Sequence, residues 1–314
     1  MGDRSAISWT EATWNPVTGC NPVSAGCDHC YAATIARRFA GTPAYPPGFA
    51  VTLRPERLDQ PIRWRRPRQI FVCSMADLFH DEVPEEYLDQ VFAVMQAAPQ
   101  HTFQVLTKRH GRLRSYLSRR AGRASTSAPP PNIWVGVTVE SQRWVGIRIP
   151  ALQAAPAAVR FLSCEPLLGP VRLCSCDGAV FEVRRHPFLV DPACPLHGGR
   201  RVDWVIVGGE SGAGARPMHP SWVRSLRDEC EAAEVAFHFK QWGRFTPQAS
   251  PADPWHTREP DVWVSTSGAV ATEAEAMAGG GSWAGVYAVG KRAAGRELDG
   301  RTWDEQPSAR EATS

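Results

Sequence analysis

Three cysteines lie close together near the amino terminus, in a segment rich in proline, glycine and asparagine. With the spacing C-x6-C-x2-C, they are Cys20, Cys27 and Cys30. Thiolates are soft ligands for zinc and for iron–sulfur clusters, and Gly19 and Gly26 let the backbone wrap closely around such a group. The loop is either a structural zinc site with a distant fourth ligand, such as His29 or Cys73, or a cluster site with one iron left open for chemistry.

A second group of candidate ligands lies between residues 171 and 201. It consists of Cys174, Cys176, Cys194 and His197, spaced as C-x-C, 17 intervening residues and C-x2-H, and His186 is an alternative to His197. These donors suffice for a closed tetrahedral zinc site, which would stabilise a short insertion. The alternative is an unliganded loop with incidental thiols. Buried, inert thiols are expected at the remaining positions Cys73, Cys164 and Cys230, which lie in apolar strands or a helix.

Polar side chains with acid–base chemistry follow several apolar runs. The candidate catalytic residues are Glu165, Glu210 and Lys240, and the same predicted pocket includes Arg216, Gln241 and Trp242. Two carboxylates at one end of a sheet can bind ribose hydroxyls or move protons. The stretch GGESGAG around Glu210 either brings backbone N–H groups close to an anion or, by default, forms a simple turn, and Trp242 is equally well explained as a core residue.

These groups need elements that bring them together, and the chain alternates short apolar runs with amphipathic stretches. Strands are predicted over 69–74, 102–108, 132–139, 159–165, 203–210 and 235–242, and helices over 85–98 and 221–234. Strands that are apolar on both faces are typical of parallel sheets covered by helices. The pattern predicts an α/β fold, either a doubly wound sheet or a partial or complete (β/α) barrel. Charged residues at the strand ends favour the barrel.

Composition limits the domain organisation. The chain has 314 residues, of which 43% are hydrophobic, and this suffices for one large core. We expect an α/β barrel over 1–243, including the Cys/His insertion at 171–201. An irregular extension over 244–314 is expected to pack back on the barrel and to end in a disordered tail. The net charge of +3 is too small to demand a polyanionic partner.

The sequence also bears on the compartment. It lacks an apolar run of about 20 residues and a charged-then-apolar leader, so we expect a cytoplasmic protein without a membrane partner. In that reducing compartment an odd number of cysteines, nine, argues for metal binding or buried thiols over disulfides. The cysteines are therefore treated as candidate ligands.

Several longer sequence motifs of the chain resemble those of a known protein family. The run WTEATWNP leads into WNPVTGCNPVSAGCDHCYA, and matching pieces follow as ADLFHDEVP, LTKR, FLSCEPLLGP, WVIVGGESGAGARPM, FKQWG and GRELDGRTWDE. Together they resemble a family of phage and bacterial proteins of unassigned function that is similar to the radical S-adenosylmethionine (SAM) superfamily. The usual superfamily signature is C-x3-C-x2-C, from which this loop differs in its first gap.

The resemblance implies an iron–sulfur enzyme. Cys20, Cys27 and Cys30 would hold three irons of a [4Fe–4S] cluster, and the fourth iron would bind the amino and carboxylate groups of SAM. Reduction by a protein such as flavodoxin or ferredoxin would then release a 5′-deoxyadenosyl radical, which abstracts a hydrogen atom from a C–H bond. A structural zinc in the insertion is compatible with this chemistry.

The resemblance also implies contacts to SAM. Tyr31 matches the aromatic position that approaches the adenine. Ser74 and Asp77 follow a strand after which superfamily members bind the SAM amine, although a turn or helix cap explains them equally well. Lys108 and Arg109 would bind the SAM carboxylate or a substrate phosphate, and their alternative is a solvated surface pair.

Basic runs at 63–69, 108–123 and 183–186 suggest contacts to phosphates. Together with the phage association of the family, they favour modification or repair of a nucleobase in DNA or RNA. Three alternatives stay open. They are a solvated arginine-rich helix, radical chemistry on a peptide or small metabolite, and a non-catalytic nucleic-acid-binding module stabilised by zinc or a cluster.

Overall fold

The computed structural model describes residues 5–42, 45, 48–123, 128–175, 194–197, 199, 201–247 and 259–307. Two compact units make up the chain. The first combines Met1–Thr138 with Arg148–Phe161, and the second combines Val139–Ile147 with Leu162–Ser314. The expected domain boundary near residue 243 is a different division of the chain and stays a prediction.

Seven strands form the main sheet in the order β1-β4-β5-β6-β7-β8-β9. Their bounds are β1 Ala12–Trp14, β4 Gln69–Val72, β5 Thr102–Thr107, β6 Ile133–Thr138, β7 Val159–Cys164, β8 Trp204–Gly208 and β9 Ala236–Gln241. The pairs β1–β4, β4–β5, β5–β6 and β8–β9 are parallel. All six predicted strands are present, and the predicted α/β class is confirmed. Within the described residues β1 and β9 end the order, which corresponds to the partial form of the barrel.

The short strand β1 is absent from the predicted strands because only three residues, ATW, pair with β4. Its register joins Ala12 to Ile70 and Trp14 to Val72. Three residues are too few for a periodic pattern to appear in the sequence. The strand nevertheless matters for function, because the three-cysteine segment begins just beyond its carboxyl end.

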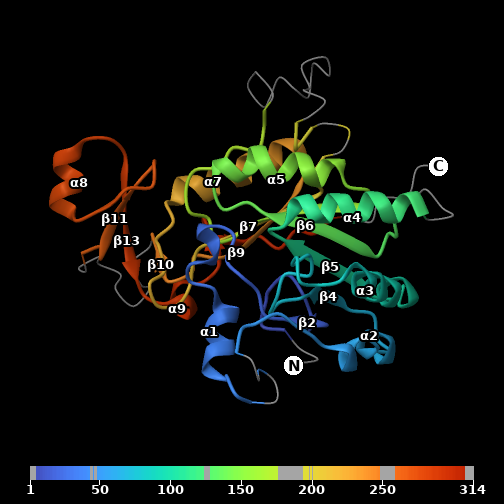
Figure 1. Ribbon diagram of the computed structural model, residues 1–314. Helices are drawn as coiled ribbons and strands as arrows, with labels where there is room; N and C mark the ends of the chain where they lie inside the picture. Colours follow the sequence, from blue (N-terminus) through green and yellow to red (C-terminus); the bar gives the residue numbers. More distant parts are fainter. Residues whose placement is uncertain are drawn as a thin grey trace. The chain divides into compact units, whose positions relative to one another are not determined.

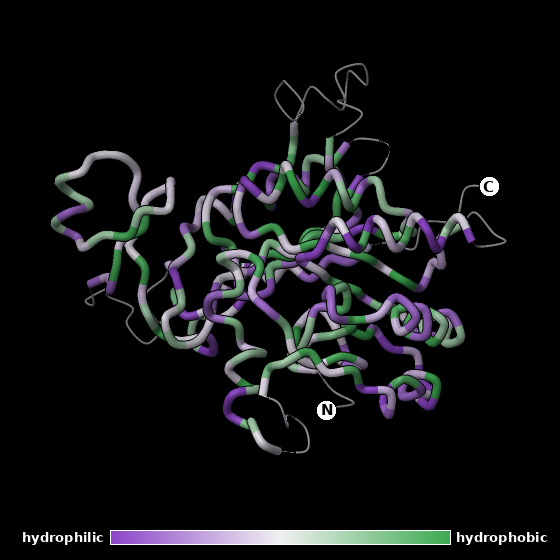
Figure 2. The backbone as a smooth tube through the Cα atoms, viewed as in Figure 1, coloured by the Kyte–Doolittle hydropathy of each residue, from purple (hydrophilic) through white to green (hydrophobic). Residues whose placement is uncertain are grey.

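Helices α3 (Glu85–Ala97) and α4 (His110–Arg123) follow β4 and β5 and lie side by side in the first unit (Figure 1). Phe79 packs on Phe92 of α3 and on Tyr116 of α4, with ring centroids 6.4 and 5.9 Å apart. The strands are mostly hydrophobic, whereas α4 is mostly hydrophilic (Figure 2). Burial of the strand side chains under one apolar helix face therefore stabilises this unit. This unit also contains α1 (Tyr31–Arg38), α2 (Gln60–Arg63), η1 (Ala25–Cys27) and η2 (Pro55–Arg57).

The two predicted helices are confirmed as α3 and α7 (Pro220–Ala233). Proline opens α7, and the His219 side chain caps it by accepting a hydrogen bond from the N–H of Ser221 at 3.1 Å. Helix α5 (Gln142–Ala154) follows β6. Among the described residues, no helix has both the length and the apolar character needed to cross a bilayer.

The stretch 244–284, expected to be irregular, contains regular structure in its described part. A four-stranded antiparallel sheet has the order β10-β13-β11-β12, with β10 Phe245–Thr246, β11 Val262–Ser265, β12 Val270–Ala271 and β13 Trp283–Ala288. Glycine, serine and alanine dilute the alternation of these strands, which hides them in the sequence. Beyond them lie α8 (Glu273–Gly279), α9 (Lys291–Ala294), β14 (Glu297–Leu298) and β15 (Arg301–Thr302). The expected disordered tail falls mostly on 308–314, outside the described residues.

Candidate functional site

The three-cysteine segment leaves β1 at its carboxyl end, at the edge where the parallel strands β4 and β5 also end. Cys20 follows β2 (Val17–Thr18), Cys27 ends η1, and Cys30 is the N-cap of α1. All three cysteines are half-exposed. Because a helix N-terminus favours anions, the backbone at Cys30 suits a thiolate or an anionic cluster.

Gly19 fixes the path of this segment. Its φ is +87°, it forms a parallel bridge to Ala76, and its N–H donates to the Met75 carbonyl over 3.0 Å. A Cβ at this position would lie 2.0 Å from the carbonyl oxygen of Ala50. Only glycine fits here, so the residue before Cys20 is set by backbone crowding on two sides.

The thiols of this loop do not form a compact group of donors among the described residues. In the part of the chain that the structure describes, the one group of three or more His, Cys, Asp and Glu donors that all lie within 4.8 Å of one another is in the second unit. A mononuclear zinc site needs donors at that spacing, whereas a four-iron cluster binds each thiolate at a different iron. Three soft thiols on a glycine-bearing loop therefore fit a cluster, and the choice between iron–sulfur and zinc stays a prediction.

A guanidinium lies beside the first cysteine. Arg109 Nη1 donates to Cys20 Sγ over 3.6 Å, and Nη2 donates to the Asn21 carbonyl over 3.4 Å. The same guanidinium pairs with Asp77 at 3.6 Å, and these two side chains are only 11% and 9% exposed. Burial and the Asp77 charge raise the pKa of the Cys20 thiol above its usual range, while Arg109 lowers it. Arg109 thus favours the thiolate where burial opposes it, and it is not a solvated surface residue.

Asp77 is occupied by contacts within the protein. Its Oδ1 accepts hydrogen bonds from Thr107 Oγ1 at 2.6 Å and from the N–H of Phe79 at 3.0 Å, and its Oδ2 accepts from the N–H of Lys108 at 3.0 Å. These bonds tie the loop after β4 to the loop after β5. They support the turn interpretation of Asp77, and its binding of the SAM amine stays a prediction. The ammonium of Lys108 has no partner among the described residues, which leaves it available for an anion.

Tyr31 and Ser74 are linked directly. The Tyr31 hydroxyl donates to the Ser74 carbonyl, and the ring is 52% exposed at the start of α1. Asn15, which is 1% exposed, contacts the Ser74 hydroxyl at 3.2 Å and accepts from the N–H of Met75 at 2.9 Å. Asn15 is absent from the predicted site, although it lies in the WNP motif that precedes the cysteines. It positions the loop on which Ser74 lies.

In the second unit, two of the three predicted catalytic residues form one group. Glu165 follows β7, and Lys240 lies near the carboxyl end of β9. Lys240 Nζ is 2.8 Å from each carboxylate oxygen of Glu165, and Gln241 Nε2 donates to that carboxylate over 3.2 Å. The side chains of Lys240 and Glu165 are 16% and 17% exposed, so water and ligands still reach this pair.

The third predicted catalytic residue, Glu210, has a cationic partner of its own. It accepts a hydrogen bond from the N–H of Arg216 at 2.8 Å and forms a two-point ion pair with that guanidinium at 2.7 and 2.9 Å. Such paired geometry is strong and holds both groups in place. The structure therefore ties Glu165 and Glu210 to different cations, and their joint action stays a prediction.

The glycine-rich stretch after β8 supports the turn interpretation. A Cβ at Gly209 would lie 1.9 Å from the Trp242 carbonyl oxygen, and one at Gly243 would lie 2.2 Å from the Glu210 carbonyl oxygen. The glycines thus permit close approach of the chain segments after β8 and β9. Trp242 is buried, with its indole N–H donating to the Glu297 carbonyl over 2.8 Å, which supports its interpretation as a core residue.

The insertion brings together three of its four predicted ligands. Cys174, Cys194 and His197 offer donor atoms within 4.8 Å of one another, whereas Cys176 lies outside the described residues. Burial raises the pKa of the Cys194 thiol, but backbone N–H groups of Ser175, Leu196 and His197 and the His197 side chain lower it, to about 6 overall. This part of the chain is therefore built around an anionic sulfur.

Several arginines of helix α4 have partners within the chain, and phosphate binding by the basic run 108–123 stays a prediction. Arg119 and Arg123 pair with Glu85 of α3 at 2.6 and 3.5 Å, and Arg120 pairs with Asp89 at 3.4 Å. Arg112 donates to backbone carbonyls of the loop after β4. Internal partners thus neutralise much of this basic run, and the basic run at 183–186 lies outside the described residues.

Helix α1 presents a mixed aromatic and basic surface instead. Tyr31, Ile35 and Phe39 are exposed at intervals of four residues, which places them on one face. Arg37 and Arg38 are also exposed, and the Arg38 guanidinium lies 5.8 Å from the Phe39 ring centroid. This surface was not predicted, and its signal in the sequence is the run IARRF directly after the cysteine motif.

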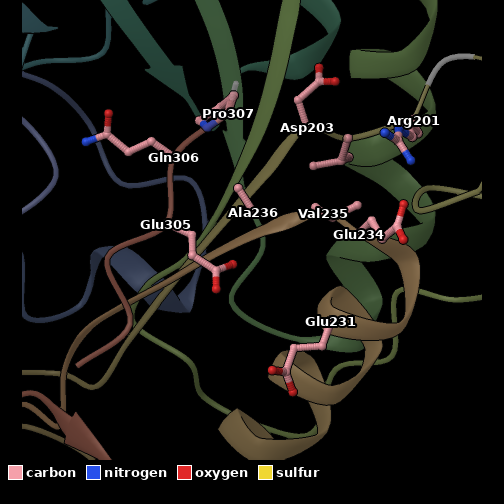
Figure 3. A pocket seen from close by; sticks show the side chains of 10 residues that line it. Arg201, Asp203, Glu231, Glu234, Val235, Ala236, Glu305, Gln306 and Pro307 are labelled. Atoms are coloured by element: carbon pink, nitrogen blue, oxygen red, sulfur yellow. The ribbon is translucent and has the colours of Figure 1, made fainter. Parts of the chain in front are cut away.

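A hollow of about 460 Å³ lies in the second unit, lined by Arg201, Val202, Asp203, Glu231, Glu234, Val235, Ala236, Glu305, Gln306 and Pro307 (Figure 3). It lies where β8 and β9 begin, because its residues precede or open both strands. Active sites of barrel-type α/β folds lie at the opposite ends of the strands. The hollow is therefore not a candidate active site, despite its size.

Comparisons with known proteins give a family. Two solved structures are similar in fold: a cysteine-to-serine mutant of spore photoproduct lyase (14% identity, TM-score 0.40, 71% of this chain and 61% of that one) and a spore photoproduct lyase complexed with dinucleoside spore photoproduct (11%, 0.37, 68% and 58%). The chain thus spans about three fifths of their length, and likeness at these TM-scores assigns it no function. Curated proteins gave no match. A family model matches residues 4–307, so the chain belongs to the family described as "Protein of unknown function (DUF5131)".

Proposed function

We propose that this protein is an iron–sulfur enzyme of the radical SAM type that acts on a nucleobase in DNA or RNA. The observation that carries the proposal is the set of three half-exposed thiols, Cys20, Cys27 and Cys30, on one loop at the carboxyl ends of parallel strands. This is the end of a barrel-type sheet where catalytic groups collect. Among the described residues they do not form a group of donors within 4.8 Å of one another, which suits a cluster with one open iron better than a single closed ion.

The chain's own residues have three tasks at this loop. The thiols hold the cluster, Arg109 stabilises the thiolate of Cys20, and the helix N-terminus at Cys30 favours the negative charge. When bound, the cluster and SAM supply the chemistry that removes a hydrogen atom from an unactivated C–H bond. The electron comes from a protein reductant of the flavodoxin or ferredoxin class.

SAM itself needs groups that orient it. The half-buried ammonium of Lys108, which has no partner in the described chain, suits the SAM carboxylate. Tyr31 offers an exposed ring beside the cysteine motif, suited to stacking on the adenine. Asp77 and Asn15 are positioning residues. Their hydrogen bonds hold the loops on which Lys108 and Ser74 lie.

The pair Glu165–Lys240 supplies acid–base chemistry in the second unit. A carboxylate and an ammonium at 2.8 Å can exchange a proton with a ligand that enters the pair, or bind ribose hydroxyls. Gln241 orients the carboxylate from its other side. We propose that this pair, and not Glu210, has the acid–base role, because Glu210 is held in its two-point bond with Arg216.

Helix α1 supports nucleic acid as the substrate class. Exposed aromatic rings beside arginines are typical of surfaces on which single-stranded bases stack while the backbone is neutralised. Tyr31, Phe39, Arg37 and Arg38 provide both features next to the cysteine loop. The internally paired arginines of α4 make a smaller contribution in this proposal.

The first experiment tests the chemistry. Protein is reconstituted anaerobically with iron and sulfide, reduced with dithionite and mixed with SAM, and 5′-deoxyadenosine is measured by chromatography. We expect product from the wild-type protein and none from Cys27→Ala. The matched control is Cys230→Ala, which removes a buried thiol of α7 and should keep the activity. A wild-type protein with a complete cluster that neither binds SAM nor forms the product would overturn the proposal.

The second experiment tests the substrate class. Binding of single-stranded DNA and RNA oligonucleotides is followed by fluorescence anisotropy at several salt concentrations. Phe39→Ala should weaken binding by about tenfold, the value of one lost stacking contact, and Arg38→Gln should reduce the salt dependence. Arg119→Gln is the control, since that guanidinium already pairs with Glu85. Binding unchanged in the α1 variants, or absent altogether, would point to a peptide or small-molecule substrate.

A further inference from the structure

We propose that Cys174, Cys194 and His197 bind a structural zinc ion, which joins the two ends of the insertion between β7 and β8. This site lies in the second unit and is independent of the N-terminal cysteine loop. It therefore does not depend on the proposed radical chemistry.

The distances between the donors match one face of a zinc tetrahedron. With Zn–S of about 2.3 Å and Zn–N of about 2.05 Å, tetrahedral angles place two sulfurs ~3.8 Å apart and a sulfur and a nitrogen ~3.6 Å apart. The sulfurs of Cys174 and Cys194 are 3.9 Å apart. His197 Nδ1 lies 3.6 Å from the first sulfur and 3.5 Å from the second. All three edges thus agree with a single ion at their centre.

A disulfide or an iron–sulfur cluster fits these distances less well. A disulfide needs its sulfurs about 2.05 Å apart, far closer than the sulfurs of Cys174 and Cys194. An iron–sulfur cluster binds each ligand at a different iron, which separates the donors further than one shared ion does. A mononuclear site with two thiolates and an imidazole is typical of zinc.

The chain around the ligands is held in place by its own contacts. Glu229 of α7 is buried, and its Oε2 accepts hydrogen bonds from the N–H groups of Leu173 and Cys174, each at 2.8 Å. The carbonyl of Pro195, next to the second ligand, accepts from the N–H of Val202 at 2.7 Å. Such support of ligand-bearing backbone is what fixes the geometry of metal sites.

The positions of the ligands along the chain indicate a structural role for the ion. One ligand lies at the start of the insertion and two lie near its end, and Cys194 comes 20 positions after Cys174. A metal that joins them closes the loop between these positions, which stabilises the fold by limiting the freedom of the unfolded chain. The fourth coordination position is predicted from the sequence to be filled by Cys176, which lies outside the described residues, and the experiment tests that residue separately.

The test uses the full chain, purified under reducing, anaerobic conditions. Metal analysis by mass spectrometry should give about one zinc per chain, as a single tetrahedral site requires. Cys194→Ser and His197→Ala should lose this zinc, and Cys176→Ser should lose it too if that thiol is the fourth ligand. Cys27→Ser is the control, which should keep the zinc while losing iron.

A second measurement does not depend on whether the variants fold. Wild-type protein stripped with a chelator is titrated with cobalt(II), which reports tetrahedral thiolate ligation by its visible absorption. Uptake of one equivalent, reversed by zinc, supports the site. A wild-type chain that takes up neither metal, one that holds iron at these residues, or one whose Cys174 and Cys194 are joined by a disulfide overturns it. Lack of 5′-deoxyadenosine in every sample would overturn the proposed function and leave the zinc site intact.

Discussion

The two cysteine groups of this protein differ in how closely their donors are assembled. In the insertion, two sulfurs and one imidazole nitrogen lie within 4.8 Å of one another, and Cys194 is fully buried. In the N-terminal loop, three half-exposed thiols are distributed between β2 and α1. Closed metal sites serve stability, and sites with an open position serve chemistry. One chain thus uses the same ligand type in two arrangements that predict two different roles.

The two cysteine groups also differ in the charge of the side chain beside them. A buried cation, Arg109, lies beside Cys20, where it stabilises additional negative charge. Near the insertion group a carboxylate, Glu229, instead binds the N–H groups of the backbone that holds Cys174. The first arrangement suits an anionic cluster with bound cofactor, and the second fixes a backbone.

Substitution of one cysteine in each group gives the largest expected effect. Cys27→Ser should lower formation of 5′-deoxyadenosine by at least about a thousandfold, because a cluster ligand is lost, and it should leave the zinc content unchanged. Cys194→Ser should remove the zinc and change activity by less than about threefold at low temperature, because its site is structural. Activity and both metals are measured on the same samples. Loss of both metals from either variant would contradict the separation of roles.

Removal of the zinc alone gives the next effect. Closing a loop of about 20 residues is worth roughly 3 kcal/mol in the chain-entropy model, so a chelator should lower the free energy of unfolding by about that amount. Denaturant unfolding of the wild-type protein with and without chelator measures this change in the free energy of unfolding. In Cys194→Ser, which already lacks the zinc, the chelator should cause no further change. Brief exposure to air is the converse treatment, which should bleach the cluster and leave the zinc in place.

The strands of the fold could be predicted from the sequence because each is apolar on both faces. The runs at Gln69–Val72 and Trp204–Gly208 are examples, and both are buried strands of the parallel sheet. The three residues of β1 carry no periodic signal. In the small antiparallel sheet, glycine and alanine weaken the alternation of WAGVYA, so β13 is recognised only once its partners β10 and β11 are known.

The site was less predictable than the fold, because its contacts join distant parts of the chain. Cys20 and Arg109 are 89 residues apart, and Glu165 and Lys240 are 75 apart. Residue type and strand-end position were enough to nominate Glu165 and Lys240, whereas Cys20 came from the cysteine spacing and Arg109 from the family resemblance. These signals could not reveal that Asp77 is occupied by Thr107 and two backbone N–H groups, since that depends on how two loops meet.

Acid can be used to compare the two proposed metal sites only at pH values where the chain stays folded. Buried His238 limits this pH range, because it destabilises the folded chain as the pH falls. Burial lowers its pKa from 6.5 to about 4, with nearby Asp304 opposing and Arg296 and Lys240 assisting the shift. Between these values the unfolded chain binds a proton that the folded chain does not, so stability falls as the pH falls. From pH 7 to pH 5 the loss is about 2 kcal/mol.

His238→Phe should remove this contribution, and denaturant unfolding at pH 7 and pH 5 measures it. Unfolding at pH 8, where the histidine is neutral in both states, gives the separate cost of repacking beside Trp204. The variant should then lose about 2 kcal/mol less than wild type on acidification. An equal loss in both proteins would assign the acid sensitivity to other groups, including the metal ligands.

Arg109 gives the smallest expected effect and the most specific one, because it acts on a single thiol. Burial and Asp77 raise the pKa of Cys20 and Arg109 lowers it, so Arg109→Gln should raise that pKa further. Alkylation of Cys20 as a function of pH, followed by peptide mass spectrometry in a Cys27→Ser, Cys30→Ser background, measures the shift. Lys108→Gln is the control, and should weaken SAM binding in the intact loop without moving the pKa of Cys20. Cluster reconstitution in Arg109→Gln should then require a correspondingly higher pH, whereas zinc binding at Cys174 and Cys194 should not change. Equal sensitivity of both metal groups to Arg109 would contradict the view that the cation serves the N-terminal loop alone.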